Sequence, residues 1–107
     1  MQNKTNDGYY EAFWPRTARQ QKVKPLAKRL DTLEGKTIAQ LWDYAFRGDK
    51  VFEILEDSIK KQYPNARFIS WREFGNTHGN DEAKVMEDLP RLLKKFNVDA
   101  VISSMAC

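Results

Sequence analysis

The segment "KTIAQLWDYAFRGDKVFEILEDSIKKQYPNARFISW", residues 36–71, contains two runs suited to β-strands, separated by a longer amphipathic stretch. The first run, residues 36–42, follows the turn "LEG" and is rich in residues that favour a sheet. The second run, residues 66–71, contains aromatic and β-branched residues, which favour a strand. A strand, a helical crossover and a second strand form a parallel unit, and such crossovers are nearly always right-handed.

The stretch between these strands, residues 48–64, predicts a helix. Asp49 is a candidate N-cap, and Pro64 follows the lysine-rich last turn. One face of this helix is apolar, because hydrophobic side chains recur at helical spacing. They are Val51, Phe52, Leu55 and Ile59.

The pattern repeats further along the chain. A second helix is predicted from about Asp81 to Phe96, with a stripe formed by Met86, Leu89, Leu93 and Phe96. Pro90 is expected to kink this helix or to mark a restart, because proline has no backbone donor. "VDAVISS", residues 98–104, predicts a third strand. We therefore expect an α/β fold of the Rossmann-like or flavodoxin-like three-layer kind, with a short parallel β-α-β-α-β sheet.

Length and composition favour one small domain. The 107 residues are 41% hydrophobic and 31% charged, and no apolar run approaches the ~20 residues that span a bilayer. The N-terminus lacks the apolar core of a secretory signal, and a single cysteine cannot form an internal disulfide. These features predict a cytoplasmic protein without a membrane partner. Residues 31–107 are expected to form an α/β domain that is incomplete at its C-terminus, because doubly wound sheets usually have five or six strands.

The basic charge is concentrated in residues 1–30, which we interpret as an N-terminal arm. This arm carries seven Lys or Arg side chains against two acidic ones, whereas the remainder carries eleven basic and thirteen acidic side chains. The arm could cover an acidic neighbouring surface, stay solvated, or follow nucleic acid phosphates, of which the last is the least expected. Its aromatic stretch "YYEAFWP" favours docking, so a second copy or a partner subunit is expected.

The candidate site follows from the sheet. In an open parallel sheet all strands end at one edge, and ligands bind outside these carboxyl ends. The segments that follow the strands are "DYAFRGD", "REFGNTHGN" and "SSMAC". They carry Asp43, Arg47, Asp49, Asn76, His78 and Cys107 toward the same edge, where Trp42 and Trp71 end their strands. A helix after the third strand would lower the pKa of the Cys107 thiol.

These residues admit more than one role. Cys107 is a candidate nucleophile or only a small apolar residue, and His78 is its candidate base, a ligand donor or a solvated loop residue. Arg47 and Asp43 are candidates for substrate binding, and Asp49 serves more simply as a helix cap. Trp71 and Asn76 are further candidates for substrate binding, and Trp42 and Trp71 are expected to pack in the core or to line the crevice.

Other chemistries lack their motifs. The sequence has no P-loop, no G-x-G-x-x-G and no His/Cys cluster with zinc-ligand spacing, so no metal is expected and the cofactor stays unknown. "ISSMAC" lacks the G-x-S-x-G pattern of a nucleophile elbow, which excludes that class of hydrolase.

Residues 25–107 resemble the UGSC-like proteins, a family named for a Sec/Cys-Gly-Ser-Cys motif at a strand-to-helix turn. The likeness lies in "LDTLEGKTIAQLWDYAFRGDKVFEILEDSIKKQYP", "RFISWREFGNTHG" and "VDAVISSMAC". It implies a thiol or selenol redox site, with Cys107 at the first motif position or immediately before it. The Gly-Ser-Cys that should follow is absent, which suggests a shortened chain or a UGA codon read as a stop.

Two functions are therefore expected. The first is a thiol or selenol redox enzyme fragment or subunit that acts on a small molecule, with Cys107 and His78 as catalytic residues. The alternative is a non-catalytic α/β subunit that binds a protein partner through its arm. In the first case we expect ordinary reactivity of Cys107 in the chain as given, and enhanced reactivity once Gly-Ser-Cys follows it.

Overall fold

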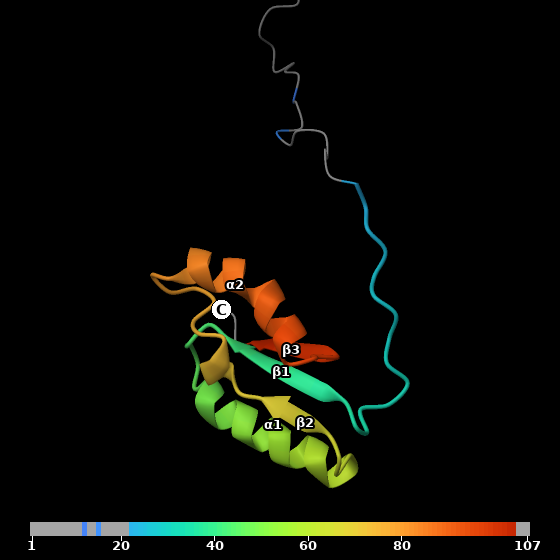
Figure 1. Cartoon of the computed structure of the whole chain (residues 1–107). Coiled ribbons are helices and arrows are strands. Elements are labelled where there is room, and N and C mark those ends of the chain that lie inside the picture. The colour runs from blue at the N-terminus through green and yellow to red at the C-terminus, as the bar shows by residue number, and fades with distance from the viewer. Residues whose placement is uncertain (1–11, 13–14, 16–21, 105–107) are drawn as a thin grey trace, which may run out of the picture.

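The computed structural model of the chain describes Ala12, Pro15 and residues 22–104. The expected alternation of strands and helices is confirmed, and Figure 1 shows the arrangement. The elements are β1 (Thr37–Trp42), α1 (Gly48–Gln62), β2 (Arg67–Ile69), the 3-10 helix η1 (Trp71–Glu73), α2 (Glu82–Lys95) and β3 (Ala100–Ser104). None of the helices in this described part is long and apolar enough to cross a membrane.

The sheet is parallel and its order is β2-β1-β3. Thr37 lies opposite Arg67 at one end of the central strand, and Trp42 lies opposite Ser104 at the other. From β1 the chain passes through α1 to β2 on one side of the central strand. It then passes through α2 to β3 on the other side. This places a switch in strand order between β1 and β3, as at the start of a flavodoxin-like sheet.

The two helices cover opposite faces of the sheet (Figure 1). Side chains along a strand alternate between faces. Gln40 of β1 donates a hydrogen bond from Nε2 to the Glu56 carboxylate of α1, at 3.3 Å. Its neighbours Ala39 and Leu41 instead belong to a core cluster packed against α2. The result is the expected three-layer α/β arrangement, in which every residue of β1 is buried.

The core on the α2 face consists of Ala39, Leu41 and Phe74, surrounded by half-buried apolar side chains. These are Ile69, Leu89, Leu92, Leu93, Phe96 and Val98. The predicted stripe of α2 was wrong at Met86, whose side chain is exposed. Val85 is half-buried in its place, because the contact face of the helix is rotated by one residue at its N-terminal end.

On the other face, Phe52 of α1 and Ile38 of β1 are the largest fully buried side chains. The predicted apolar face of α1 is confirmed, since Val51, Leu55 and Ile59 are half-buried beside the fully buried Phe52. Ile54 points away from this face and is exposed.

Two local predictions need correction, and a third is narrowed. Asp49 does not cap α1: the N-cap residue is Arg47, in a left-handed conformation, and Asp49 lies in the first turn. Of the two outcomes expected at Pro90, a kink or a restart, the restart does not occur, because Pro90 lies inside the single helix α2. β2 ends at Ile69, before Trp71, because the Ser70 hydroxyl accepts a hydrogen bond from the Arg72 backbone N–H and starts η1.

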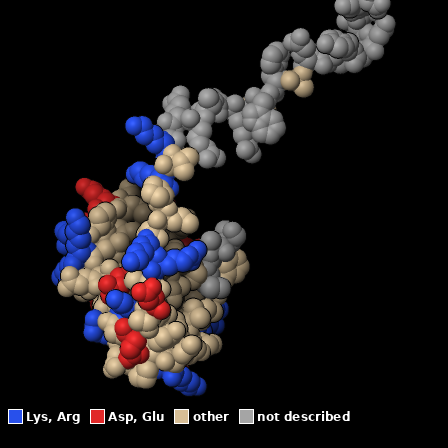
Figure 2. Space-filling model, turned by 90° about the vertical axis from the view of Figure 1, so that its right-hand side faces the viewer, with Lys and Arg blue, Asp and Glu red and all other residues tan. Residues whose placement is uncertain are grey.

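Residues 22–32 lead into the domain without helix or strand. Their side chains are exposed, including those of Val23, Leu26 and Leu30. Figure 1 shows this leader running away from the sheet, and Figure 2 shows Lys and Arg side chains gathered where it joins the domain. Most of the predicted arm, and Cys107 itself, lie outside the described residues.

Candidate functional site

The carboxyl ends of the three strands meet around Trp42, the last residue of β1. Ser104, the last residue of β3, pairs with it on one side. On the other side the chain that follows β2 returns to the sheet, so that Asn76 forms a parallel bridge with Trp42. The Thr77 backbone N–H then donates to the Trp42 carbonyl, at 3.2 Å. We call this region the carboxyl edge.

The loop from Asp43 to Arg47 carries three non-glycine residues in the left-handed region. The φ angles are 62° for Tyr44, 56° for Phe46 and 55° for Arg47. Residues with side chains adopt this region at a cost of about 1–3 kcal/mol each, and such strain is concentrated at functional sites. The loop is therefore a candidate part of the functional site.

Hydrogen bonds to both backbone groups of Ala45, from the side chains of Trp42 and Asp43, hold this loop in place. The Trp42 indole Nε1 donates to the Ala45 carbonyl at 2.8 Å, and the Ala45 N–H donates to the Asp43 carboxylate at 3.2 Å. Asp43, predicted from the sequence as a substrate-binding residue, thus uses one carboxylate oxygen to shape the loop. Side chains of this type commonly stabilise tight turns in this way.

Three aromatic rings pack together beside this loop, and we call Trp42, Tyr44 and Trp71 the aromatic triad. The ring centroids of Trp42 and Tyr44 lie 4.8 Å apart at a tilt of 32°. The Trp71 ring stands edge-on to both, with centroid distances of 4.7 Å to Trp42 and 5.3 Å to Tyr44. Trp42 is only 8% exposed, whereas Tyr44 is 48% exposed. The triad therefore has a buried base and an open side.

Arg72 extends the triad with a positive charge. Its guanidinium carbon lies 4.3 Å from the centroid of the Trp71 ring, a cation–π arrangement. Its Nη1 donates to the Ser70 hydroxyl at 3.3 Å. Among the described residues no carboxylate lies within ion-pair distance of this guanidinium.

His78 is attached to the end of β1 through its neighbours. The Asn76 side-chain oxygen accepts a hydrogen bond from the His78 backbone N–H at 2.9 Å, which turns the chain at this point. The Thr77 hydroxyl donates to the Trp42 carbonyl at 3.3 Å and lies 3.0 Å from His78 Nδ1. If the single proton of that hydroxyl is donated to the Trp42 carbonyl, Nδ1–H is the donor to the hydroxyl, and in this neutral tautomer Nε2 has the lone pair.

Arg47 and Asp49 pair with each other rather than with the triad. Arg47 Nε lies 3.3 Å from an Asp49 carboxylate oxygen, in an exposed position. Desolvation acts to raise the pKa of Asp49, but the hydrogen bond from Arg47 leads the effects that lower it. The Lys50 backbone N–H and the charges of Arg47 and Lys50 act in the same direction, so the pKa lies below its ordinary value.

Ser104 brings a second polar group to the carboxyl edge. Its hydroxyl oxygen is buried and has no hydrogen-bond partner among the residues that the structure describes. Because Ser104 pairs with Trp42, its side chain lies on the same face of the sheet as the indole. A buried hydroxyl without a partner is unfavourable by about 1–3 kcal/mol, which makes this position notable beside a candidate site.

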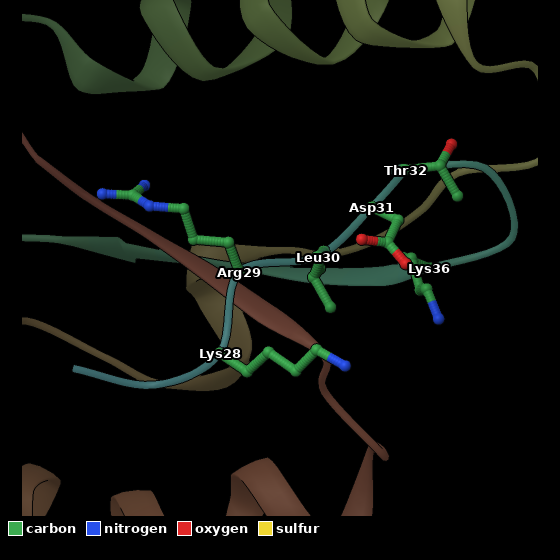
Figure 3. Close-up of a pocket in the computed structure, with 6 residues that line it drawn as sticks. All are labelled: Lys28, Arg29, Leu30, Asp31, Thr32 and Lys36. Carbon is green, nitrogen blue, oxygen red and sulfur yellow. The ribbon is translucent and has the colours of Figure 1, made fainter. Parts of the chain in front are cut away.

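A hollow at the other end of β1 contains none of the predicted site residues. It measures about 330 Å³ and is formed by Lys28, Arg29, Leu30, Asp31, Thr32 and Lys36. Figure 3 shows Arg29 extending away from the amino groups of Lys28 and Lys36. Within the described residues, no group of three or more His, Cys, Asp and Glu side chains is placed to hold a metal ion.

The structure adds Tyr44, Arg72 and Thr77 to the residues that the sequence indicates. No pattern marks Tyr44 or Arg72, because the triad and its cation come from two loops that are distant in sequence. Thr77 had a weak signal, since it lies beside the only histidine of the chain. The predicted residues Asp43, Trp71, Asn76 and His78 lie in the segments that meet at the carboxyl edge.

The comparison with protein families gives one match. The model of the UGSC family matches residues 11–107, which includes the segment whose resemblance was noted from the sequence. Neither the curated proteins nor the solved structures include a match to this chain.

Proposed function

The chain belongs to the UGSC family, and from this premise we propose that it provides a thiol or selenol redox site at the carboxyl edge. Cys107 is the nucleophile and His78 is its base. The substrate is a small molecule bound beside the aromatic triad, and the reaction takes place in the reducing cytoplasm. The protein is then an oxidoreductase subunit rather than a purely structural one.

One observation carries this proposal: β3 ends at Ser104, directly beside Trp42. Cys107 follows Ser104 by three residues, and three residues of extended chain reach at most about 11 Å. Covalent connectivity therefore limits how far Cys107 can lie from Ser104, which supports a thiol site at the edge to which Thr77 also attaches His78. The lone pair on His78 Nε2 is available to accept a proton.

The chemistry requires a second thiol. In the proposed step His78 takes the proton of Cys107, and the thiolate attacks one sulfur of a disulfide substrate. A mixed disulfide forms and the other half of the substrate leaves as a thiolate. Cys107 is the single cysteine of these 107 residues, so a second thiol from outside them is needed to resolve the mixed disulfide.

Alkylation by iodoacetamide across a pH series tests this function. The chain should show an ordinary thiol pKa near 8.5, and a version extended by Gly-Ser-Cys should show a lower pKa for Cys107. In the extended version, His78→Ala should slow alkylation at pH 7 by about 3- to 10-fold, because the base that favours the thiolate is lost. Thr77→Val should have a smaller effect in the same direction.

The controls separate the thiols. Cys107→Ser in the extended version leaves only the added cysteine and gives its background rate. If extension leaves the pKa of Cys107 near 8.5, and His78→Ala changes nothing, the proposed redox site is wrong.

A second candidate function is a non-catalytic subunit that binds a partner through the arm. The observation that favours it is the exposure of Val23 and Leu26 among Lys22, Lys24 and Lys28 in the leader. Apolar side chains between cations suit an acidic protein surface with an apolar centre.

Under this second function the chain is expected to associate with itself or with a partner. Light scattering of the full chain at micromolar concentration should give a mass above that of the monomer. Deletion of residues 1–30 should lower that mass, because the basic and aromatic arm is removed. A stable monomer before deletion would count against arm-mediated assembly.

A further inference from the structure

We propose that the aromatic triad and Arg72 form a binding site for a planar aromatic ring that carries an anionic group. This inference rests on the proposed function, because it names the substrate class for the same carboxyl edge. It is carried by two independent features: an open aromatic surface held by a strained loop, and a guanidinium that has no carboxylate partner within the described part of the chain.

The triad offers ring surface that a ligand can cover. Trp42 is the buried base, and Tyr44 is 48% exposed above it. Trp71 is half-buried and stands nearly perpendicular to both rings, at 75° and 77°. A flat conjugated molecule can therefore lie on the open side of Tyr44 while its edge meets Trp71. Both offset-stacked and edge-to-face contacts are favourable between aromatic rings.

The loop presents Tyr44 in a fixed position. Its left-handed conformation is retained because the Trp42 indole binds the Ala45 carbonyl and Asp43 binds the Ala45 N–H. A tyrosine that only filled the core would be buried and would not need this conformation. Strained residues persist where the surrounding structure enforces them, and they are concentrated at ligand sites.

Arg72 determines the charge of the ligand. Its guanidinium carbon lies 4.3 Å from the centroid of the Trp71 ring, and one of its nitrogens donates to the Ser70 hydroxyl. Guanidinium carries five N–H donors in a plane, so donors remain for a carboxylate, sulfonate or phosphate group. No carboxylate of the described residues competes for them within ion-pair distance. A ring bound against the triad would place an attached anion beside this guanidinium.

Three probe molecules separate the two features. 2-Naphthoate has the ring and the anion, 2-naphthalenemethanol has the ring alone, and cyclohexanecarboxylate has the anion alone. Binding to the full chain is followed by the indole N–H signal of Trp71 in nitrogen-15 NMR spectra. The measurement is made in the Cys107→Ser variant, so that no thiol chemistry contributes.

We expect 2-naphthoate to bind at least about tenfold more tightly than either other probe, because it alone uses both features. Arg72→Gln should abolish its preference over 2-naphthalenemethanol. Tyr44→Asn should weaken both naphthalene compounds by about tenfold. Asparagine tolerates the left-handed region, so this variant removes the ring and keeps the loop. Arg91→Gln, at an exposed arginine of α2, should leave all three affinities unchanged.

The proposal is overturned if the three probes bind equally, if none shifts the Trp71 signal, or if Arg72→Gln and Arg91→Gln behave alike. In these cases the triad only stabilises the loop. Since the binding assay contains no thiol, its failure leaves the alkylation result untouched. Conversely, tight binding of 2-naphthoate together with a Cys107 pKa that stays near 8.5 in the version extended by Gly-Ser-Cys would refute the redox function and leave the binding site standing.

Discussion

Phe52→Ala is expected to lower the free energy of unfolding by about 3–5 kcal/mol. The Phe52 side chain is 2% exposed and is one of the two largest fully buried side chains of the described domain. Its truncation leaves a cavity between α1 and the sheet and removes apolar area from the core. In so small a domain this loss is a large part of the total stability, which is typically about 5–15 kcal/mol.

Urea unfolding of the full chain measures this effect, with an unchanged slope as evidence that both states keep their compactness. Ile54→Ala is the matched control, because Ile54 lies two residues away on the same helix and is 65% exposed. It should change the free energy by less than about 0.5 kcal/mol. Equal losses in the two variants would show that α1 does not pack as described.

The elements that the sequence predicts well are those with local periodic patterns. α1 and α2 follow from apolar residues at helical spacing, and β1 follows from a run of sheet-forming residues after a turn. The parallel topology then follows from the crossover lengths. The strand order β2-β1-β3 does not, because both positions of β3 satisfy these lengths.

The errors have two causes: a local conformation that composition does not indicate, and, for α2, packing against distant segments. Trp71 suits a strand by composition, but the Ser70 hydroxyl binds the backbone of Arg72 and starts a 3-10 turn instead. The aspartate at position 49 suits a helix cap, but Arg47 occupies that position in a left-handed conformation. Met86 is exposed, and not part of the predicted apolar stripe, because the packing of α2 against Phe74 and Leu41 fixes the rotation of this helix.

The candidate site was predictable in its location and not in its composition. The rule that ligands bind at the carboxyl ends of parallel strands directs attention to the segments after β1, β2 and β3. The triad and the contact between Thr77 and His78 depend on how two loops meet at Trp42, which no single segment encodes. The role of Cys107 stays a prediction, which the alkylation series addresses.

Trp42 links the stability of the fold to the geometry of the site. It is buried at the end of the central strand, and it also anchors the loop and forms the base of the triad. The start of α1 packs directly against its indole, because a Cβ atom added at Gly48 would meet Nε1 and lie 2.6 Å from Cδ1 and Cε2. A substitution at Gly48 therefore tests how firmly the indole is held.

Gly48→Ala is expected to destabilise the protein by about 2–3 kcal/mol, because the added methyl overpacks a buried ring. A decrease in the free energy of unfolding is informative, because replacing glycine by alanine in a helix ordinarily stabilises the protein by about 0.5–1 kcal/mol. Ser58→Ala, at an exposed position of α1, serves as a control and should have an effect within about 0.5 kcal/mol. Urea unfolding measures both.

A double-mutant cycle assigns the effect to the indole. In a Trp42→Val background the contacting ring atoms are gone, so Gly48→Ala should become neutral or stabilising, and the two substitutions should couple by more than about 1 kcal/mol. In the single variant, the Trp71 indole signal should also shift, because a displaced Trp42 moves the ring that lies 4.7 Å away. If Gly48→Ala instead stabilises the chain and leaves that signal unchanged, the Trp42 indole moves aside without resistance. The indole then does not hold Tyr44 in a fixed position, as the proposed ligand site requires.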